Sequence, residues 1–171
     1  MRPRLARAYM SRMFFDAALR YNAQLRGCDC ELADDGDLAI DETSITPVIL
    51  SVGLDRRAHP DDELPVGRSE FLTQAGFSER RGGPSDALDL RGDLIGSRLW
   101  LLDRAKKTEI TRLMVLAWLR ECLQWAQLET GVPAEIEVEW LGRIGGSGSE
   151  AAILAYRVLV ADAEFSRRQA A

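Results

Sequence analysis

The feature that most constrains this chain is residues 108–129, which we predict to form one long helix. Thr108 is placed to cap its N-terminus, and Gly131 and Pro133 end it. Most of its circumference is apolar, and its polar residues form one narrow stripe: Glu109, Arg112, Arg120, Gln124 and Gln127. Such a helix packs across a sheet and is covered on a second side as well, so we expect the rest of the chain to supply a sheet.

The clearest strand follows this helix. Residues 135–141 alternate, so that Ile136, Val138 and Trp140 face one way and three glutamates face the other. After a glycine-rich turn over residues 142–149, we predict a return strand over residues 151–161. This strand is apolar on both faces, which is typical of a strand covered on both faces. The two strands form a C-terminal β-hairpin that we expect to have an available edge.

The N-terminal half predicts shorter elements. Residues 14–20 are expected to form a first strand, and residues 28–33 and 37–40 a hairpin around the Asp34–Asp37 turn. An acid and hydroxyl cluster before an apolar run predicts a short helix over residues 45–54. The predicted fold class is therefore α+β, with a small antiparallel sheet packed by a long helix and a shorter helix.

The domain organisation is simple. Residues 1–13 form a basic N-terminal arm, and residues 14–171 form a single domain. Within that domain, residues 56–95 are rich in glycine, proline and charge, with little apolar periodicity. A connection of about 40 residues is far longer than usual, so we predict an interaction loop that a partner orders.

Composition disfavours several classes of protein. A net charge of -5 disfavours general nucleic-acid binding. No stretch approaches the roughly 20 apolar residues of a membrane span, and N-terminal arginines interrupt any signal-peptide core. The three cysteines are an odd number, which argues against a disulfide framework. We expect a protein that is cytosolic when made and binds neither nucleic acid nor membrane.

Candidate catalytic groups do not assemble into a site. The only histidine, His59, lies in a polar loop, and the adjacent acids Asp61, Asp62 and Glu63 are typical of a solvated turn. The glycines of residues 145–148 lie between two strands rather than before a helix, which is where a phosphate loop lies. We therefore predict no enzymatic activity, no cofactor and no metal.

The arginine pairs favour protein contacts. Arg56–Arg57 and Arg80–Arg81 could clamp a phosphate, but a negatively charged chain favours pairing with carboxylates of neighbouring subunits. We hypothesise that Arg56, Arg57 and Arg98 form ion pairs that either join subunits or anchor the loop.

Four stretches, in order, resemble a known family. They are residues 36–38, residues 48–51 leading to 55–62, residues 92–102, and the long helix with the strand at residues 135–140. On these stretches the chain resembles the Mu-like phage baseplate wedge proteins, and the similarity runs from about Phe15 to about Asp162. These are relatives of the sheath-initiator wedge subunits, called lysozyme-like, of contractile-tailed phages.

Two positions depart from the family pattern. Gly83-Pro84 follows Arg80-Arg81-Gly82 where Mu-like members carry paired tryptophans. Residues 132–134 replace an acid-Pro-Arg triplet of the broader family. The contacts of those groups are therefore not carried over.

The resemblance implies a non-enzymatic structural subunit of a tail baseplate. It implies several symmetric copies per particle, with six expected around the tail axis. It also implies contacts with other wedge proteins, with tail hub or tube proteins and with the sheath protein. The expected location is the virion tail baseplate, after assembly in the host cytoplasm. Alternatives are a tail-associated peptidoglycan hydrolase and another tail assembly factor.

A specific mechanism follows for seeding the sheath. The hairpin of residues 135–141 and 151–160 is expected to accept a strand from a sheath subunit, with Val158 on the free edge. The predicted interaction residues, from the loop, the segment before the helix and this hairpin, are Arg56, Arg57, Pro60, Asp61, Arg80, Arg81, Arg98, Trp100, Ile153, Tyr156, Val158 and Val160.

Overall fold

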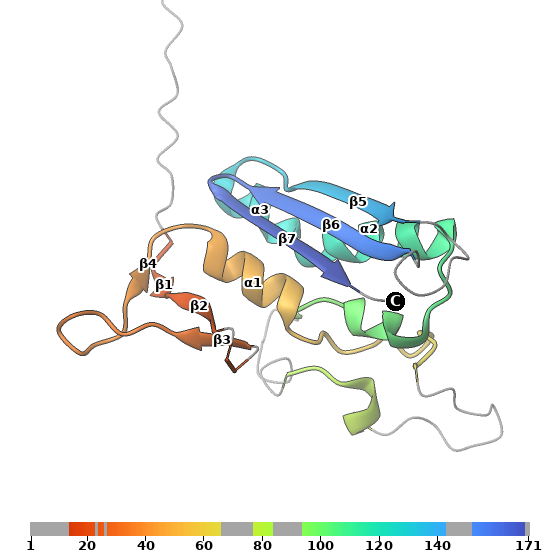
Figure 1. Ribbon diagram of the computed structural model, residues 1–171, viewed down its shortest axis with the longest axis horizontal. Coiled ribbons are helices and arrows are strands. Elements are labelled where there is room, and N and C mark those ends of the chain that lie inside the picture. Colours follow the sequence, from red (N-terminus) through yellow and green to blue (C-terminus); the bar gives the residue numbers. More distant parts are fainter. Residues whose placement is uncertain are drawn as a thin grey trace, which may run out of the picture.

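A three-stranded antiparallel sheet forms one layer of the protein (Figure 1). The computed structural model describes residues 14–22, 24–25, 27–65, 77–83, 94–142 and 152–169. The sheet has the order β5 (Glu135–Leu141), β6 (Ile153–Val160) and β7 (Ala163–Gln169). Helices α1 (Ile45–Gly53) and α2 (Glu109–Cys122) share one core cluster with the buried side chains of β5 and β6. The predicted α+β class is confirmed.

The long helix is bent rather than continuous. Thr108 caps α2 by accepting a hydrogen bond at Oγ1 from the backbone N–H of Thr111, at 3.2 Å. Helix α2 ends at Cys122, and α3 (Gln124–Thr130) begins after a turn at Leu123. The long helix predicted over residues 108–129 is therefore present, but the bend at Leu123 was not predicted. Leu123 is 2% exposed, and the bend lets both helices contribute to the same core.

The core face of α2 has the expected helical spacing. Val115, Trp118, Leu119 and Cys122 are buried against the sheet and α1. The prediction that a second side of this helix is covered was wrong for its first half. Ile110, Leu113 and Met114 are 70%, 50% and 44% exposed, so an apolar stripe of α2 faces outward.

Helix α1 begins at Ile45, directly after the acid and hydroxyl cluster, as the sequence predicted. Asp41 accepts hydrogen bonds from the backbone N–H of Thr46, at 3.2 Å, and from its hydroxyl, at 2.8 Å. Burial would raise the pKa of Asp41, but these bonds and those from Thr43 outweigh it and lower the pKa below the usual value. The side chains that satisfy the helix N-terminus are therefore Asp41 and Thr43, while Ser44 makes no capping bond.

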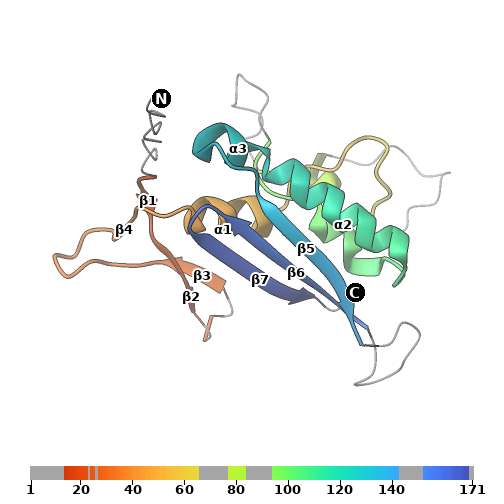
Figure 2. The same cartoon turned by 90° about the horizontal axis from the view of Figure 1, so that it is seen from above.

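Residues 14–42, which we call the β arm, form short antiparallel ribbons beside α1 (Figure 2). Strand β1 (Asp16–Ala17) pairs with β4 (Ile40–Asp41), and β2 (Leu19–Asn22) pairs with β3 (Gly27–Cys30). The ribbons meet at a triangle of backbone hydrogen bonds, each 2.8 to 2.9 Å long, among Ala18, Glu31 and Ala39.

The predictions for this arm were partly right. The strand expected over residues 14–20 is split at Ala18 into β1 and β2. The turn at residues 34–37 is present, and it closes a bridge between Leu32 and Leu38. However, β3 and β4 do not pair with each other as a hairpin would, because each takes a separate partner at the triangle.

The predicted free edge at residues 151–161 was wrong. Strand β6 is the centre of the sheet, because Val158 lies opposite Ile136 on one side and Phe165 on the other. The C-terminal hairpin is extended by β7, which we had not predicted. The expectation that β6 is covered on both faces was also wrong, since its side chains alternate between a buried face and a face where Ile153 and Arg157 are exposed.

Three predicted segments lie wholly or partly outside the described residues. They are the basic arm at residues 1–13, much of the loop at residues 56–95, and most of the turn at residues 142–149. Across the part of the chain that is described, no helix has the length and apolar character needed to cross a membrane.

The packing predicts a clear contrast between two leucines of the bent helix. Leu119 is fully buried, and Leu128 is 81% exposed. Leu119→Ala should lower the free energy of unfolding by about 3 kcal/mol, because it removes buried methyl groups and leaves a cavity. Leu128→Ala should change it by less than about 0.5 kcal/mol. Urea unfolding followed by circular dichroism measures both, and equal losses would contradict the assigned packing.

Candidate interaction surfaces

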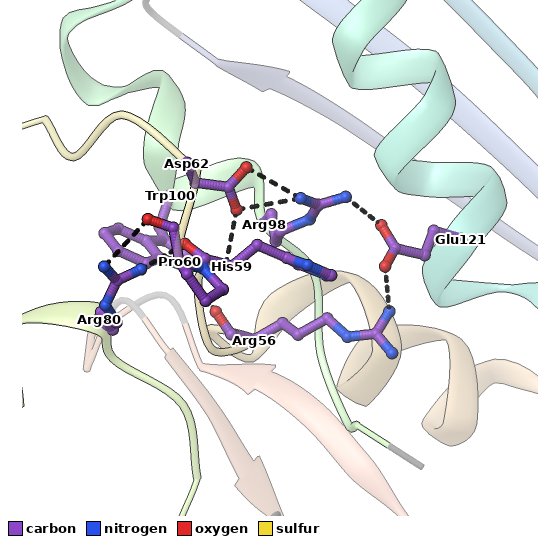
Figure 3. Close-up of polar contacts among 8 residues, drawn as sticks. All are labelled: Arg56, His59, Pro60, Asp62, Arg80, Arg98, Trp100 and Glu121. Atoms are coloured by element: carbon purple, nitrogen blue, oxygen red, sulfur yellow. Dashed lines mark hydrogen bonds and ion pairs between the residues drawn. The ribbon is translucent and has the colours of Figure 1, made fainter. Parts of the chain in front are cut away.

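A network of ion pairs connects the start of the predicted loop to α2 (Figure 3). Glu121 of α2 is shared by two guanidinium groups, with Arg98 Nη2 at 2.6 Å and Arg56 Nη1 at 3.2 Å. Arg98 also donates from Nη1 to both carboxylate oxygens of Asp62, at 3.0 Å. Of the two roles proposed for Arg56 and Arg98, the structure therefore shows loop anchoring within the chain.

This network is only slightly exposed to solvent. The side chains of Arg56 and Arg98 are 13% and 16% exposed. Burial would lower the pKa of Arg98, but its bonds to Glu121 and Asp62 outweigh this and raise the pKa. The Nε atoms of both arginines are buried without a hydrogen-bond partner in the described structure. Such a network is costly to desolvate, and removing one partner would leave the others buried without a counter-charge.

Two tryptophan rings also contact the arginines of this region and the residues next to them. Trp100 is 7% exposed, and its indole N–H donates to the carbonyl oxygen of Arg56 at 2.8 Å. The Arg81 guanidinium lies 4.5 Å from the centre of the Trp100 ring, and it also pairs with Asp55 at 2.6 Å. Arg98 lies 5.6 Å from the Trp118 ring. Trp100 is thus a buried anchor of the loop.

The turn at residues 59–62 is held by hydrogen bonds to its backbone. Asp62 accepts from the backbone N–H of His59 at 2.8 Å. Arg80 donates to the carbonyl oxygens of His59 and Pro60, the latter at 3.1 Å. The 3-10 helix η1 (Phe77–Arg80) therefore brings Arg80 back to a turn about 20 residues earlier.

A close backbone approach at Gly96 completes this anchoring. Ser97 donates from its backbone to Leu54 and accepts from Arg56, each at 2.9 Å. Gly96 has a φ of 92°, and a Cβ there would lie 2.5 Å from the Leu54 carbonyl oxygen. The 3-10 helix η3 (Leu99–Arg104), which follows directly, contributes four buried residues to the core. This segment belongs to the stretch at residues 92–102 that contributed to the resemblance, and its helical form was not predicted.

The structure thus gathers half of the predicted interaction residues into one cluster. These are Arg56, Pro60, Arg80, Arg81, Arg98 and Trp100. Asp61 lies in the same turn and is exposed, and Arg57 packs beside Gly82. Contacts of these residues with a partner stay a prediction.

The hairpin members of the predicted set are placed differently. Tyr156 is 2% exposed, and Val158 and Val160 are fully buried, so these three side chains belong to the core. Ile153 is 38% exposed and lies on the open face of the sheet. We therefore withdraw the contact role of the three buried side chains. Sequence reasoning missed β7, whose signal is the spacing of Ala163 and Phe165 after the turn at residues 161–162.

Of the three free cysteines, Cys28 and Cys30 are exposed and Cys122 is buried. Burial raises the pKa of the Cys122 thiol to about 12, so this cysteine is neutral near pH 7. The glutamates of β5 share the open sheet face with Arg157, which pairs with Glu164 at 2.8 Å and Glu137 at 3.7 Å. No cluster of three or more potential metal ligands occurs in the part of the chain that is described.

Comparison with known proteins identifies the family. A sequence model of the family described as phage protein GP46 matches residues 44–167. The chain belongs to the GP46 family. It is also 36% identical over 105 residues to the baseplate protein gp46 of Escherichia phage Mu, covering 61% of this chain and 65% of the relative. The alignment therefore spans less than two thirds of the relative's length. No solved structure matches.

The GP46 match corresponds to one part of the fold. It begins at Ser44, directly before α1, and it ends within β7. The helices, the arginine network, β5, β6 and most of β7 lie within it. The β arm precedes it, as does the stretch at residues 36–38 that contributed to the resemblance.

The shared carboxylate generates a testable prediction. Glu121→Gln keeps the shape of the side chain but removes the charge that two slightly exposed arginines share. We expect a loss of about 2 kcal/mol in the free energy of unfolding, less than for a fully buried pair, because Glu121 is 27% exposed. Urea unfolding followed by circular dichroism measures this change in the free energy of unfolding.

The matched control is Glu139→Gln, on the exposed face of β5. This change should have an effect of less than about 0.5 kcal/mol. If the two variants unfolded at the same urea concentration as the wild type, the network would not stabilise the fold.

Proposed function

We propose that this protein is a non-enzymatic structural subunit of the baseplate of a contractile phage or phage-like tail. The observation that carries the proposal is membership of the GP46 family, together with 36% identity to a protein named as a baseplate protein of phage Mu.

The finer parts of this role are also proposals. The subunit would join other wedge proteins to tail hub or tube proteins, in several symmetric copies and with six expected around the axis. It would assemble in the host cytoplasm and remain in the tail baseplate of the virion. It would also seed the first ring of the sheath by accepting a strand.

The outer edge of β7 is the place for such a strand. Val160 and Ala163 close a two-residue turn, which makes them a hydrogen-bonded pair. Bonding to β6 then alternates along the ladder, so the backbone groups of Glu164, Ser166 and Arg168 point away from β6. None of the described strands pairs with this edge. A seven-residue row of this kind can accept an added strand.

The opposite edge of the sheet is less accessible. Helix α2 lies along β5, and Arg112 donates from Nη1 to the outward carbonyl oxygen of Val138 at 3.1 Å. The Trp140 indole donates to the carbonyl oxygen of Thr108 at 3.2 Å. These side chains connect the β5 edge to the start of α2, so strand addition is proposed at β7.

The baseplate role predicts where the protein is found and what it does not do. Purified tails should contain this chain in a fixed ratio to the tube protein, measured by quantitative mass spectrometry. The purified chain should leave no cleared band in a cell-wall zymogram. Absence from tails would contradict the structural role, and a cleared band would favour the hydrolase alternative.

The strand-addition proposal predicts the effect of one substitution. In Ser166→Pro the lost N–H points away from β6, so the sheet should remain folded as edge strands with proline do. An incoming strand would lose its partner N–H, and tails complemented with this variant should lack sheath in negative-stain images. Ser166→Ala, which keeps the N–H, should give normal tails.

Two results would count against this assignment. One is a normal number of sheathed tails with folded Ser166→Pro. The other is an equal loss with Ser166→Ala, which would indicate a role for the side chain rather than the backbone. Circular dichroism of the purified variants shows whether each is folded.

A further inference from the structure

The β arm exposes more apolar surface than short ribbons usually do. Tyr21, Leu32, Leu38 and Ile40 are 68%, 68%, 46% and 58% exposed. Leu32 and Leu38 lie directly opposite each other across the turn at residues 34–37. Two-stranded ribbons are marginally stable alone in water, and contiguous exposed apolar groups mark interaction sites. The arm is therefore a surface that needs a partner.

The second uncovered apolar surface is the outer stripe of α2. Ile110, Leu113, Met114 and Ala117 follow the spacing that places residues on one face of a helix, and all four are exposed. The buried face of the same helix, at Val115 and Leu119, is turned away from it. The stripe is thus separate from the core.

Charge makes these two surfaces complementary. The β arm contains eight acidic and two basic residues, and Asp34, Asp35 and Asp37 lie beside Leu32 and Leu38 at its tip. The stripe on α2 lies between cations, with Lys106 just before the helix and Arg120 one turn after Ala117, both exposed. The acid beside the stripe, Glu109, is already paired with Arg112 at 2.5 Å. An acidic apolar arm therefore fits this stripe.

The two surfaces lie toward opposite ends of the molecule. Figures 1 and 2 both show the β arm at one end of the long axis, with α2 across the sheet toward the other end. Complementary patches at different places on one chain make a head-to-tail contact, which builds rings or filaments rather than closed dimers.

We propose that the β arm of one copy docks on the Ile110–Ala117 stripe of α2 in the next copy. The apolar side chains of the arm would cover the stripe, and the tip aspartates would lie near Lys106 and Arg120. This contact is a property of the chain itself and does not depend on the baseplate role. It assigns a task to the β arm, which the GP46 match leaves out.

Two double variants test the contact from both sides. Leu32→Ser with Leu38→Ser disables the arm, and Leu113→Ser with Met114→Ser disables the stripe. All four side chains are exposed, so the fold should be retained, as circular dichroism checks. In sedimentation velocity the wild-type chain should form species larger than a dimer as its concentration rises. Each double variant alone should weaken association by about tenfold or more.

Mixing the two double variants is the decisive experiment. The intact arm of one variant can dock on the intact stripe of the other, so the mixture should form a heterodimer and grow no further. Val132→Ser, at a position 52% exposed and in neither surface, should associate like the wild type. Association should also weaken as salt is raised, because it is supported by exposed charges.

Several outcomes would overturn the proposal. A wild-type chain that stays monomeric at the highest attainable concentration would do so. Self-association of the stripe variant into dimers would show that arms pair with arms. A mixture of the two folded double variants that stays monomeric would show that the arm and the stripe do not recognise each other.

Discussion

The start of the loop, at residues 56–62, is connected to helix α2 through one carboxylate that two arginines share. Glu121 comes from the core helix, whereas Arg56 and Arg98 come from segments more than 40 residues apart that the helix alone could not bring together. Each guanidinium gives up water for this contact, so the charges must be matched and fixed for the arrangement to persist. The pairing sets the path of the chain around Trp100, and with it the surface that this part of the molecule offers.

Sequence patterns predicted the elements whose signals are local. Each of these signals lies within a few neighbouring residues. They are the alternation in residues 135–141, the cap at Thr108, and the acid and hydroxyl cluster before α1. Strand β7 was missed because its inward residues include Arg167 beside Ala163 and Phe165, which weakens the alternation, and because its turn contains no glycine. Because β7 was not predicted, the free edge of the sheet was expected at β6, whereas it lies at β7.

The arginine cluster shows what composition can and cannot predict. The sequence indicated that its arginines would pair with carboxylates and left open whether the partners belong to the same chain. Only the fold brings Asp62 and Glu121 to the two sides of Arg98, since the three residues are separated by 36 and 23 positions. Gly82, which lies close to Arg57, and Gly96, which lies close to Leu54, look like ordinary loop residues until their positive φ angles are known.

The backbone triangle at Ala18, Glu31 and Ala39 connects the strands of the β arm and does not include the turn at its tip. Each of the three residues contributes one N–H and one carbonyl oxygen to the triangle, so a residue inserted next to it would disturb both ribbons and the bridge between Leu32 and Leu38 at once. The turn at residues 34–37 takes no part in the triangle. A change of side chain in that turn would therefore alter the surface at the tip of the arm and leave the three hydrogen bonds of the triangle in place.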